Sequence, residues 1–134
     1  ADYCKAISVS DYLPEALELA KKNCELNQIS NVTYSLLDWR TIGTDQKKYD
    51  ILLGSDIVYE KRFHDELPTA IDKLLKVDGV CIISEPNRKN AVDFFKNIIP
   101  GYFKIKQVHQ EMIYNRVLVN IFEIKKNKAL SLIE

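Results

Sequence analysis

Apolar positions along the chain change period repeatedly, from strand-like runs to helical spacing and back. Short β-favouring runs lie at residues 6–10, 32–37, 49–53 and 80–84. Segments with apolar side chains at helical spacing lie at residues 14–27, 62–76 and 89–99. Pro14 stands in the first turn of the first of these helices, a position that suits proline. The alternation predicts an α/β fold with a mostly parallel sheet and helices on both of its faces.

The pattern changes near the end of the chain. Two longer alternating segments, 102–110 and 116–125, follow the break at Pro100 and Gly101. We expect them to form a C-terminal antiparallel strand pair. We also expect a turn at Asp78 and Gly79, between the second helix and the strand at 80–84. Residues 1–125 then form one partial domain, and residues 126–134 a C-terminal tail.

Composition narrows the function classes. The 19 Lys and Arg residues balance the 19 Asp and Glu residues, so nucleic acid is an unlikely partner. The three cysteines are widely spaced and form no CxxC pair, which favours reduced thiols in the cytoplasm over disulfides or a zinc site. Apolar runs are only of strand length, and the chain does not open as a signal peptide does. We therefore expect no metal and no membrane span.

Three carboxylates follow strands at their carboxyl ends, where parallel sheets bind ligands: Asp11, Asp38 and Asp56. A carboxylate after the strand at 6–10 can accept hydrogen bonds from both hydroxyls of a ribose, which makes Asp11 the ribose candidate. Capping of the helix that starts at Pro14 explains Asp11 equally well. The sequence leaves both interpretations open.

The second carboxylate lies in an apolar and aromatic setting. Asp38 can accept from the exocyclic amine of an adenine, while Tyr12, Leu37 or Trp39 can supply an apolar wall for the ring. Asp38 can also be an ordinary loop carboxylate. For Trp39 taken alone we favour a place in the core, because large aromatic side chains are highly buried on average.

The segment GSDIVYE holds the most informative cluster. Its glycine and Ser55 allow close approach to the backbone, so Ser55 is a candidate cofactor contact. Asp56 and Tyr59 follow, an acid and a phenol three residues apart, on one face if the segment is helical. The alternative is that Asp56 caps a helix. His64 and His109 follow no triad or metal spacing, which indicates ordinary histidines.

The segments VSDYLPEALELAKKN, LLDWR, YDILLGSDIVYE and GVCIISEPNR occur in an order that resembles the class I, seven-β-strand, S-adenosylmethionine-dependent methyltransferases. The chain is most similar to the protein-lysine methyltransferase group, which carries an acid-x-x-aromatic motif after its fourth strand. The resemblance covers residues 6–125. It implies a Rossmann-like fold, S-adenosylmethionine as the cofactor and a protein lysine as the methyl acceptor.

The resemblance also implies roles for single residues. Asp11 would hold the ribose, and Leu37, Asp38 and Trp39 would frame the adenine. Asp56 and Tyr59 would lie beside the methyl group and the target amine. Arg88 would occupy a position where such proteins often have a polar residue near the substrate. The segment DIVY differs from the Asn-Pro-Pro-Tyr type, which argues against adenine or glutamine nitrogens as acceptors.

The chain departs from the family at its start. The family's first strand and its glycine-rich turn, which approaches the methionine part of the cofactor, are absent from this chain, and its four glycines are isolated. In the family's strand order, 3-2-1-4-5-7-6, that strand is central, so strands two and four would have open edges. We expect an upstream segment of several dozen residues.

Other functions remain as alternatives. A methyltransferase acting on a small molecule or RNA would share the cofactor half and differ at the acceptor pocket. A non-catalytic Rossmann-like interaction module would fit the absence of the glycine-rich turn. An NAD-linked dehydrogenase would need the ribose carboxylate but not the acid-x-x-aromatic cluster, and we rank it lowest.

Overall fold

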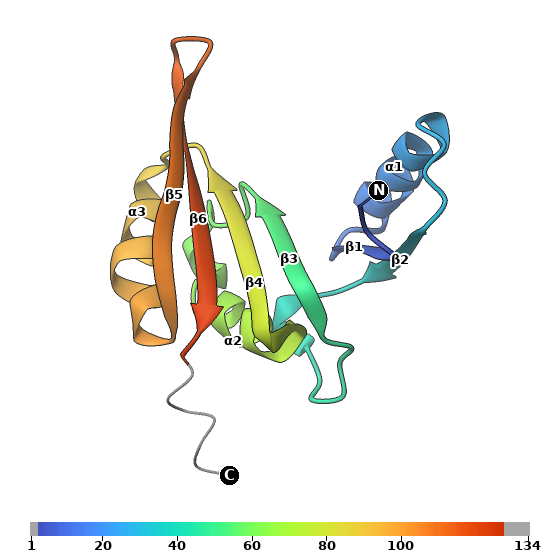
Figure 1. Cartoon of the computed structure of the whole chain (residues 1–134), viewed down its shortest axis with the longest axis horizontal. Helices are drawn as coiled ribbons and strands as arrows, with labels where there is room; N and C mark the ends of the chain where they lie inside the picture. Colours follow the sequence, from blue (N-terminus) through green and yellow to red (C-terminus); the bar gives the residue numbers. More distant parts are fainter. Residues whose placement is uncertain (1–2, 128–134) are drawn as a thin grey trace. The chain divides into compact units, whose positions relative to one another are not determined.

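The computed structural model describes residues 3–127, which fold as two compact units divided after Ile42. Strands and helices alternate along the chain, and Figure 1 shows this order. The α/β class predicted from the sequence is therefore confirmed. No helix within residues 3–127 is long and apolar enough to cross a membrane.

The first unit is a single strand–helix–strand motif. Strand β1 (Ile7–Asp11) pairs in parallel with β2 (Val32–Leu36), and α1 (Pro14–Leu26) connects them. A short 3₁₀ turn, η1 (Trp39–Thr41), follows β2. The register places Asp11 beside Leu36, so both strands end at the same edge. The predicted positions of these elements are confirmed to within about a residue.

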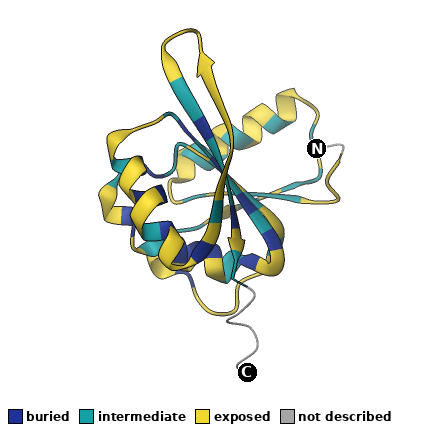
Figure 2. Ribbon diagram, turned by 60° about the vertical axis from the view of Figure 1, so that its left-hand side comes forward, coloured by how far each residue is buried: buried dark blue, intermediate teal, exposed yellow. Residues whose placement is uncertain are grey.

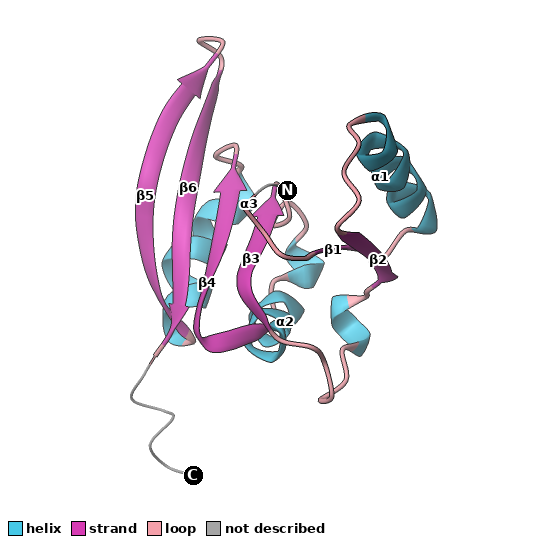
Figure 3. Cartoon of the chain, turned by 45° about the vertical axis from the view of Figure 1, so that its right-hand side comes forward, coloured by secondary structure: helices cyan, strands magenta, loops and turns pink. Residues whose placement is uncertain are grey.

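The second unit contains a mixed four-stranded sheet in the order β3-β4-β6-β5. Strand β3 (Tyr49–Ser55) runs parallel to β4 (Leu75–Glu85), whereas β6 (Val117–Lys126) runs antiparallel to β4 and to β5 (Phe103–Ile113). Figure 3 shows this sheet with α2 (Glu66–Leu74) and α3 (Lys89–Asp93) packed against it. The predicted C-terminal antiparallel pair is thus confirmed.

The core of the second unit lies between its sheet and its helices (Figure 2). Leu75 and Ile83 of β4 and Ile124 of β6 are completely buried. Phe95 stacks on Phe122 of β6 with ring centroids 4.1 Å apart, which fixes the helical layer on the sheet. The other face of the sheet exposes apolar side chains, and 78% of Leu53 is accessible.

The predicted helix at 62–76 is wrong at both ends. The segment splits into a 3₁₀ turn, η2 (Lys61–Phe63), and the shorter helix α2, and β4 begins already at Leu75. The predicted turn at Asp78 and Gly79 is an irregularity inside this strand, because Tyr49 pairs with Leu75 while Ile51 pairs with Val80. Four residues of β4 therefore bulge out of the ladder.

The predicted helix at 89–99 begins where expected but changes its winding. After α3 the chain forms a π-helical turn, η3 (Phe94–Ile98), and a 3₁₀ turn, η4 (Ile99–Gly101). Pro100 has no N–H to donate, so a regular α-helix cannot continue through it. The π turn instead buries both Phe94 and Phe95.

The edges of β1 and β3 that were expected to be open have no strand neighbour within the described residues. Within residues 3–127, β1 pairs only with β2, and β3 pairs with β4 at one edge only. The observed orders, β2-β1 and β3-β4-β6-β5, match the expected family order with its central strand omitted. The expectation of open edges on these two strands is confirmed.

Gly79 gives a test of the β4 bulge. A Cβ atom there would lie 2.9 Å from the backbone oxygen of Asp50 and 2.7 Å from Cδ1 of Leu75. Gly79→Ala should lower the free energy of unfolding by about 1–3 kcal/mol, the usual cost of overpacking, in a denaturant titration. Gly101→Ala is the matched control, because a Cβ atom at Gly101 would meet no atom within 4 Å. Equal stability of the two variants would contradict the bulge geometry.

Candidate functional site

Asp11 ends β1 and turns the chain toward α1. Its Oδ1 accepts a hydrogen bond from the N–H of Leu13 at 2.9 Å, and Leu13 is the N-cap residue of the helix. Asp11 therefore holds the turn before α1 and is not itself the cap. The Leu37 N–H donates to the backbone oxygen of Asp11 at 2.9 Å, which brings the ends of β1 and β2 together.

Asp38 is the N-cap of η1 and is closely paired with Arg40. The Arg40 guanidinium and N–H contact both carboxylate oxygens at 2.5–3.1 Å. These hydrogen bonds, with the charge of Arg40, lower the pKa of Asp38 to about 2. A carboxylate has about four acceptor positions, so Arg40 occupies most of them. Asp38 shapes the turn that carries Trp39.

The aromatic candidates of the first unit remain accessible. Tyr12 is 41% exposed, directly after Asp11. Trp39 is half-buried, so the interpretation that it belongs to the core is not confirmed. With half-buried Leu37 and Asp11, these side chains lie at the carboxyl edge of β1 and β2. A carboxylate beside aromatic and aliphatic surface is the chemistry that fits a nucleoside.

Asp56 follows β3 in a left-handed conformation, with φ of 51°. Its N–H donates to the Ser84 oxygen at 2.9 Å, which extends the pairing with β4 by one residue. Residues 57–60 are not helical, so the alternative that Asp56 caps a helix is wrong. Aspartate adopts left-handed geometry more readily than most other residues, so Asp56 suits this sharp exit from the strand.

Arg88 binds the carboxylate of Asp56 with two parallel hydrogen bonds. Its Nε donates to Oδ1 at 2.7 Å and its Nη2 to Oδ2 at 2.6 Å. Hydrogen bonding to Arg88, with its charge, lowers the pKa of Asp56, and Asp56 in turn raises the pKa of Arg88. The charges of Glu85 and Tyr59 add to the rise for Arg88, which indicates that all four groups lie close together.

Two further contacts stabilise this region, one within the loop after β4 and one from α3 to the segment 56–59. Glu85, the last residue of β4, is 2% exposed, and its Oε1 accepts from the N–H of Arg88 at 2.7 Å. Asn90 donates from Nδ2 to the backbone oxygen of Tyr59 at 3.3 Å. Sequence reasoning missed Glu85, although it ends an apolar strand just as the three aspartates do.

His64 anchors the same segment from inside the core. The ring is 4% exposed, lies 5.0 Å from the ring of Phe94, and places Nε2 3.0 Å from the backbone oxygen of Val58. Val58 is 1% exposed while Tyr59 is 46% exposed. The segment therefore has a buried anchor beside an accessible phenol.

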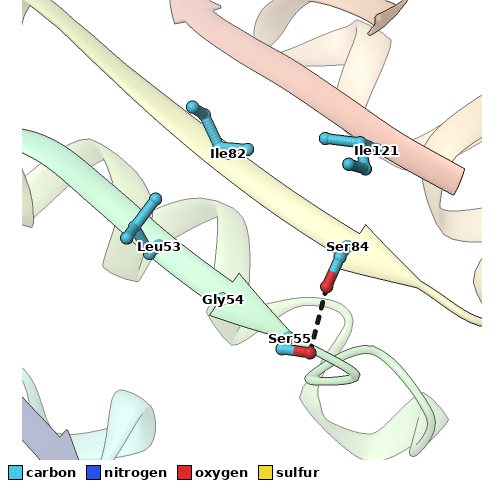
Figure 4. Close-up of a pocket in the computed structure, with 6 residues that line it drawn as sticks. All are labelled: Leu53, Gly54, Ser55, Ile82, Ser84 and Ile121. Carbon is cyan, nitrogen blue, oxygen red and sulfur yellow. Dashed lines mark hydrogen bonds between the residues drawn. The ribbon is translucent and has the colours of Figure 1, made fainter. Parts of the chain in front are cut away.

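Ser55 lies in an open groove on the sheet face away from α2 and α3 (Figure 4). Its hydroxyl accepts from the Ser84 hydroxyl at 3.0 Å. The groove has a volume of about 390 Å³ and is lined by Leu53, Gly54, Ser55, Ile82, Ser84 and Ile121. Within residues 3–127, no group of His, Cys, Asp and Glu side chains could hold a metal ion.

Comparison with known proteins identifies the fold first. A TehB-like S-adenosylmethionine-dependent methyltransferase from Corynebacterium glutamicum superposes with a TM-score of 0.66 over 91% of this chain and 68% of its own, at 10% identity. PKMT2 from Rickettsia typhi, solved with AdoHcy, gives a TM-score of 0.50 over 57% of this chain and 15% of its own, at 22% identity. The fold is therefore that of the class I methyltransferases, whose methyl donor is S-adenosylmethionine.

The family follows from the sequence match. Residues 3–100 match the family described as lysine methyltransferase, and the chain belongs to that family. A curated relative, the histone-arginine methyltransferase METTL23 of Xenopus laevis, is 37% identical over 67 residues. That match covers 47% of this chain and only 29% of the relative.

The Arg88–Asp56 ion pair gives a test in solution. Arg88→Met should raise the pKa of Asp56 toward its ordinary value of about 3.9, because the donors that favour the ionised form are gone. The pKa of Asp56 is lower in the folded state than in the unfolded state. The ion pair therefore stabilises the fold at pH values above the unfolded-state pKa, and this stabilisation is lost as the pH falls through the folded-state pKa. A ¹³C titration of the Asp56 carboxyl measures the shift. An unchanged titration would show that Arg88 does not hold the carboxylate.

Proposed function

We propose that this protein transfers the methyl group of S-adenosylmethionine to a lysine amine of another protein. The main support is the segment 56–59, an acid and an accessible phenol at the carboxyl end of β3, in a chain that belongs to the lysine methyltransferase family. Arg88, Asn90 and His64 each contact this segment through a hydrogen bond. A rigidly held acid and phenol suit a reaction that depends mainly on alignment.

The cofactor part of the proposal rests on the first unit. Asp11 uses Oδ1 for the turn before α1, and Oδ2 has no hydrogen-bond donor within residues 3–127. That oxygen is suited to accept from ribose hydroxyls. Leu37, Tyr12 and Trp39 supply apolar surface for the adenine. Asp38, already paired with Arg40, contributes by fixing the turn that carries Trp39.

The transfer part rests on Asp56 and Tyr59, with Ser55 as a further contact to the cofactor. S-adenosylmethionine supplies a methyl group on a positively charged sulfur, open to in-line attack by an amine. Asp56 is ionised at neutral pH, as an aspartate of ordinary pKa would be, and Arg88 lowers its pKa further. It can attract a lysine ammonium and orient the amine once the proton has passed to solvent, while Tyr59 borders the amine. The new N–C bond then forms as the C–S bond breaks.

A second acceptor is supported by one specific contact. The Asp56 carboxylate already binds a guanidinium in the two-bond geometry typical of arginine. The relative METTL23 is described as a histone-arginine methyltransferase. An arginine side chain is therefore the second candidate, and paired peptides that differ only in lysine or arginine would separate the two.

The cofactor site is tested by calorimetric titration of S-adenosylhomocysteine into the intact protein. Asp11→Ala should weaken binding about 10- to 100-fold, because charge-assisted hydrogen bonds worth about 1.5–3 kcal/mol are lost. Asp50→Ala is the control, since Asp50 is an exposed carboxylate paired with Lys76. Equal affinity in the two variants would remove Asp11 from the site. No binding by the folded wild type would favour a non-catalytic module.

The transfer site is tested with the acceptor peptides and radiolabelled S-adenosylmethionine. Asp56→Ala should lower kcat about 100-fold, the usual cost of misplacing a reacting group, and leave cofactor affinity within about twofold. Asp50→Ala is again the control, because it removes an ion-paired aspartate from the strand that ends just before Asp56. Unchanged turnover in Asp56→Ala would refute the assigned role.

A further inference from the structure

The hairpin of β5 and β6 extends beyond the rest of its sheet. Glu85, the last residue of β4, pairs with Asn120, whereas β6 begins three residues earlier at Val117 and β5 continues to Ile113. At about 3.3 Å per residue, this hairpin arm, defined as residues 111–119, rises about 10 Å beyond the carboxyl end of β4. Figures 1 and 3 show it projecting past the arrowheads of β3 and β4.

The arm presents apolar side chains to solvent. The exposed fractions are 51% for Met112, 39% for Ile113, 91% for Tyr114 and 42% for Val117. Single exposed apolar residues are ordinary, but four within six positions concentrate exposed apolar surface at the tip of one hairpin. Such patches commonly mark binding surfaces.

The turn at the tip places an aromatic residue in a strained backbone conformation. Tyr114 and Asn115 have φ of 52° and 53°, and the Arg116 N–H donates to the Ile113 oxygen at 3.1 Å. Positive φ at both central positions is typical of a type I′ turn, which strongly prefers asparagine, aspartate or glycine. A bulky tyrosine there is an outlier, and its exposure shows that packing within the chain does not compensate for it.

One face of the arm is directed toward the loop after β4, which carries Asn87 and Arg88. Met112 lies opposite Leu118, and two residues along, on the same face, Gln110 lies opposite Asn120. Gln110 donates to Oδ1 of Asn120 at 2.6 Å. Asn120 donates in turn to Oδ1 of Asn87 at 3.4 Å, next to Arg88. Met112 therefore lies on the arm above the loop whose arginine binds Asp56.

We propose that the hairpin arm is the docking surface for the acceptor protein and that Tyr114 and Met112 bind an apolar side chain near the methylated residue. This inference rests on the proposed function, because it takes Asp56 as the point where the acceptor side chain enters. Strands β3 and β6 lie two strand spacings apart, about 10 Å. An extended acceptor segment at about 3.3 Å per residue would thus place that apolar side chain about three to five residues from its lysine.

Synthetic peptides test this spacing directly. Each 15-residue peptide has a central lysine in a Gly/Ser background and one phenylalanine moved through positions −6 to +6. Binding to the intact protein with S-adenosylhomocysteine is measured by fluorescence anisotropy, and methyl transfer is measured separately. The best peptides should carry the phenylalanine three to five residues from the lysine, on one side. Equal binding of the whole series, or no binding by any peptide, would overturn the proposal.

Variants of the arm separate binding from folding. Tyr114→Asn should raise KM and the peptide Kd about tenfold, leave kcat unchanged, and keep or raise the Tm, because asparagine tolerates positive φ. Met112→Ser should also weaken binding and remove the positional preference. Tyr102→Asn is the control, since Tyr102 is 57% exposed at the opposite end of the same hairpin. Unchanged KM and Kd in Tyr114→Asn would overturn the proposal.

The two readouts distinguish this inference from the proposed function. If the protein methylates no lysine peptide but Tyr114→Asn still abolishes the position-dependent binding, the docking surface stands and the acceptor assignment fails. If methylation proceeds with the same KM in every arm variant, the acceptor assignment stands and the docking surface fails. Loss of a dimer in Tyr114→Asn by sedimentation, with peptide binding intact, would identify the arm as a self-association surface and overturn the proposal.

Discussion

The parallel pairing of β3 with β4 is the constraint on which the second unit depends. Ser55 lies beside Ser84, so both strands end at one edge, and Asp56 and Glu85 lie next to each other there. The extra backbone hydrogen bond from Asp56 to Ser84 carries the pairing into the loop. Because β6 continues the sheet on the other side of β4, the hairpin arm is set at the same edge by the same ladder.

Side chains from two separate segments, one at His64 and one at residues 88–90, then hold the acid and phenol in place. Arg88 binds the Asp56 carboxylate, Asn90 the backbone of Tyr59, and His64 the backbone of Val58. The His64 contact satisfies a buried polar group that would be costly to leave unpaired, whereas the other two contacts are accessible to solvent. The left-handed backbone of Asp56 starts the turn that this network holds.

The sequence predicts the parts that depend on local pattern. The periodicity of apolar residues located nearly every strand, and the position of each aspartate after a strand placed it at an edge. The bulge in β4 escaped prediction because Asp78–Gly79 favours a turn locally, whereas pairing with β3 keeps it in a strand. The engagement of Asp56 by Arg88 joins residues 32 positions apart, and no local pattern reports such a contact. The same reason hides the anchor between His64 and Val58, which looks like an ordinary histidine in the sequence.

The partial exposure of the Arg88–Asp56 pair has a consequence for the conditions in which the protein works. The side chains are 51% and 37% accessible, so dissolved ions reach them and screen their attraction. An incoming cation must compete with Arg88 for the two carboxylate oxygens of Asp56. Dissolved ions weaken the attraction of the carboxylate for Arg88 and for the incoming cation alike. We therefore expect cation binding at this edge to vary with ionic strength, and the buried contact between His64 and Val58 to be insensitive to salt.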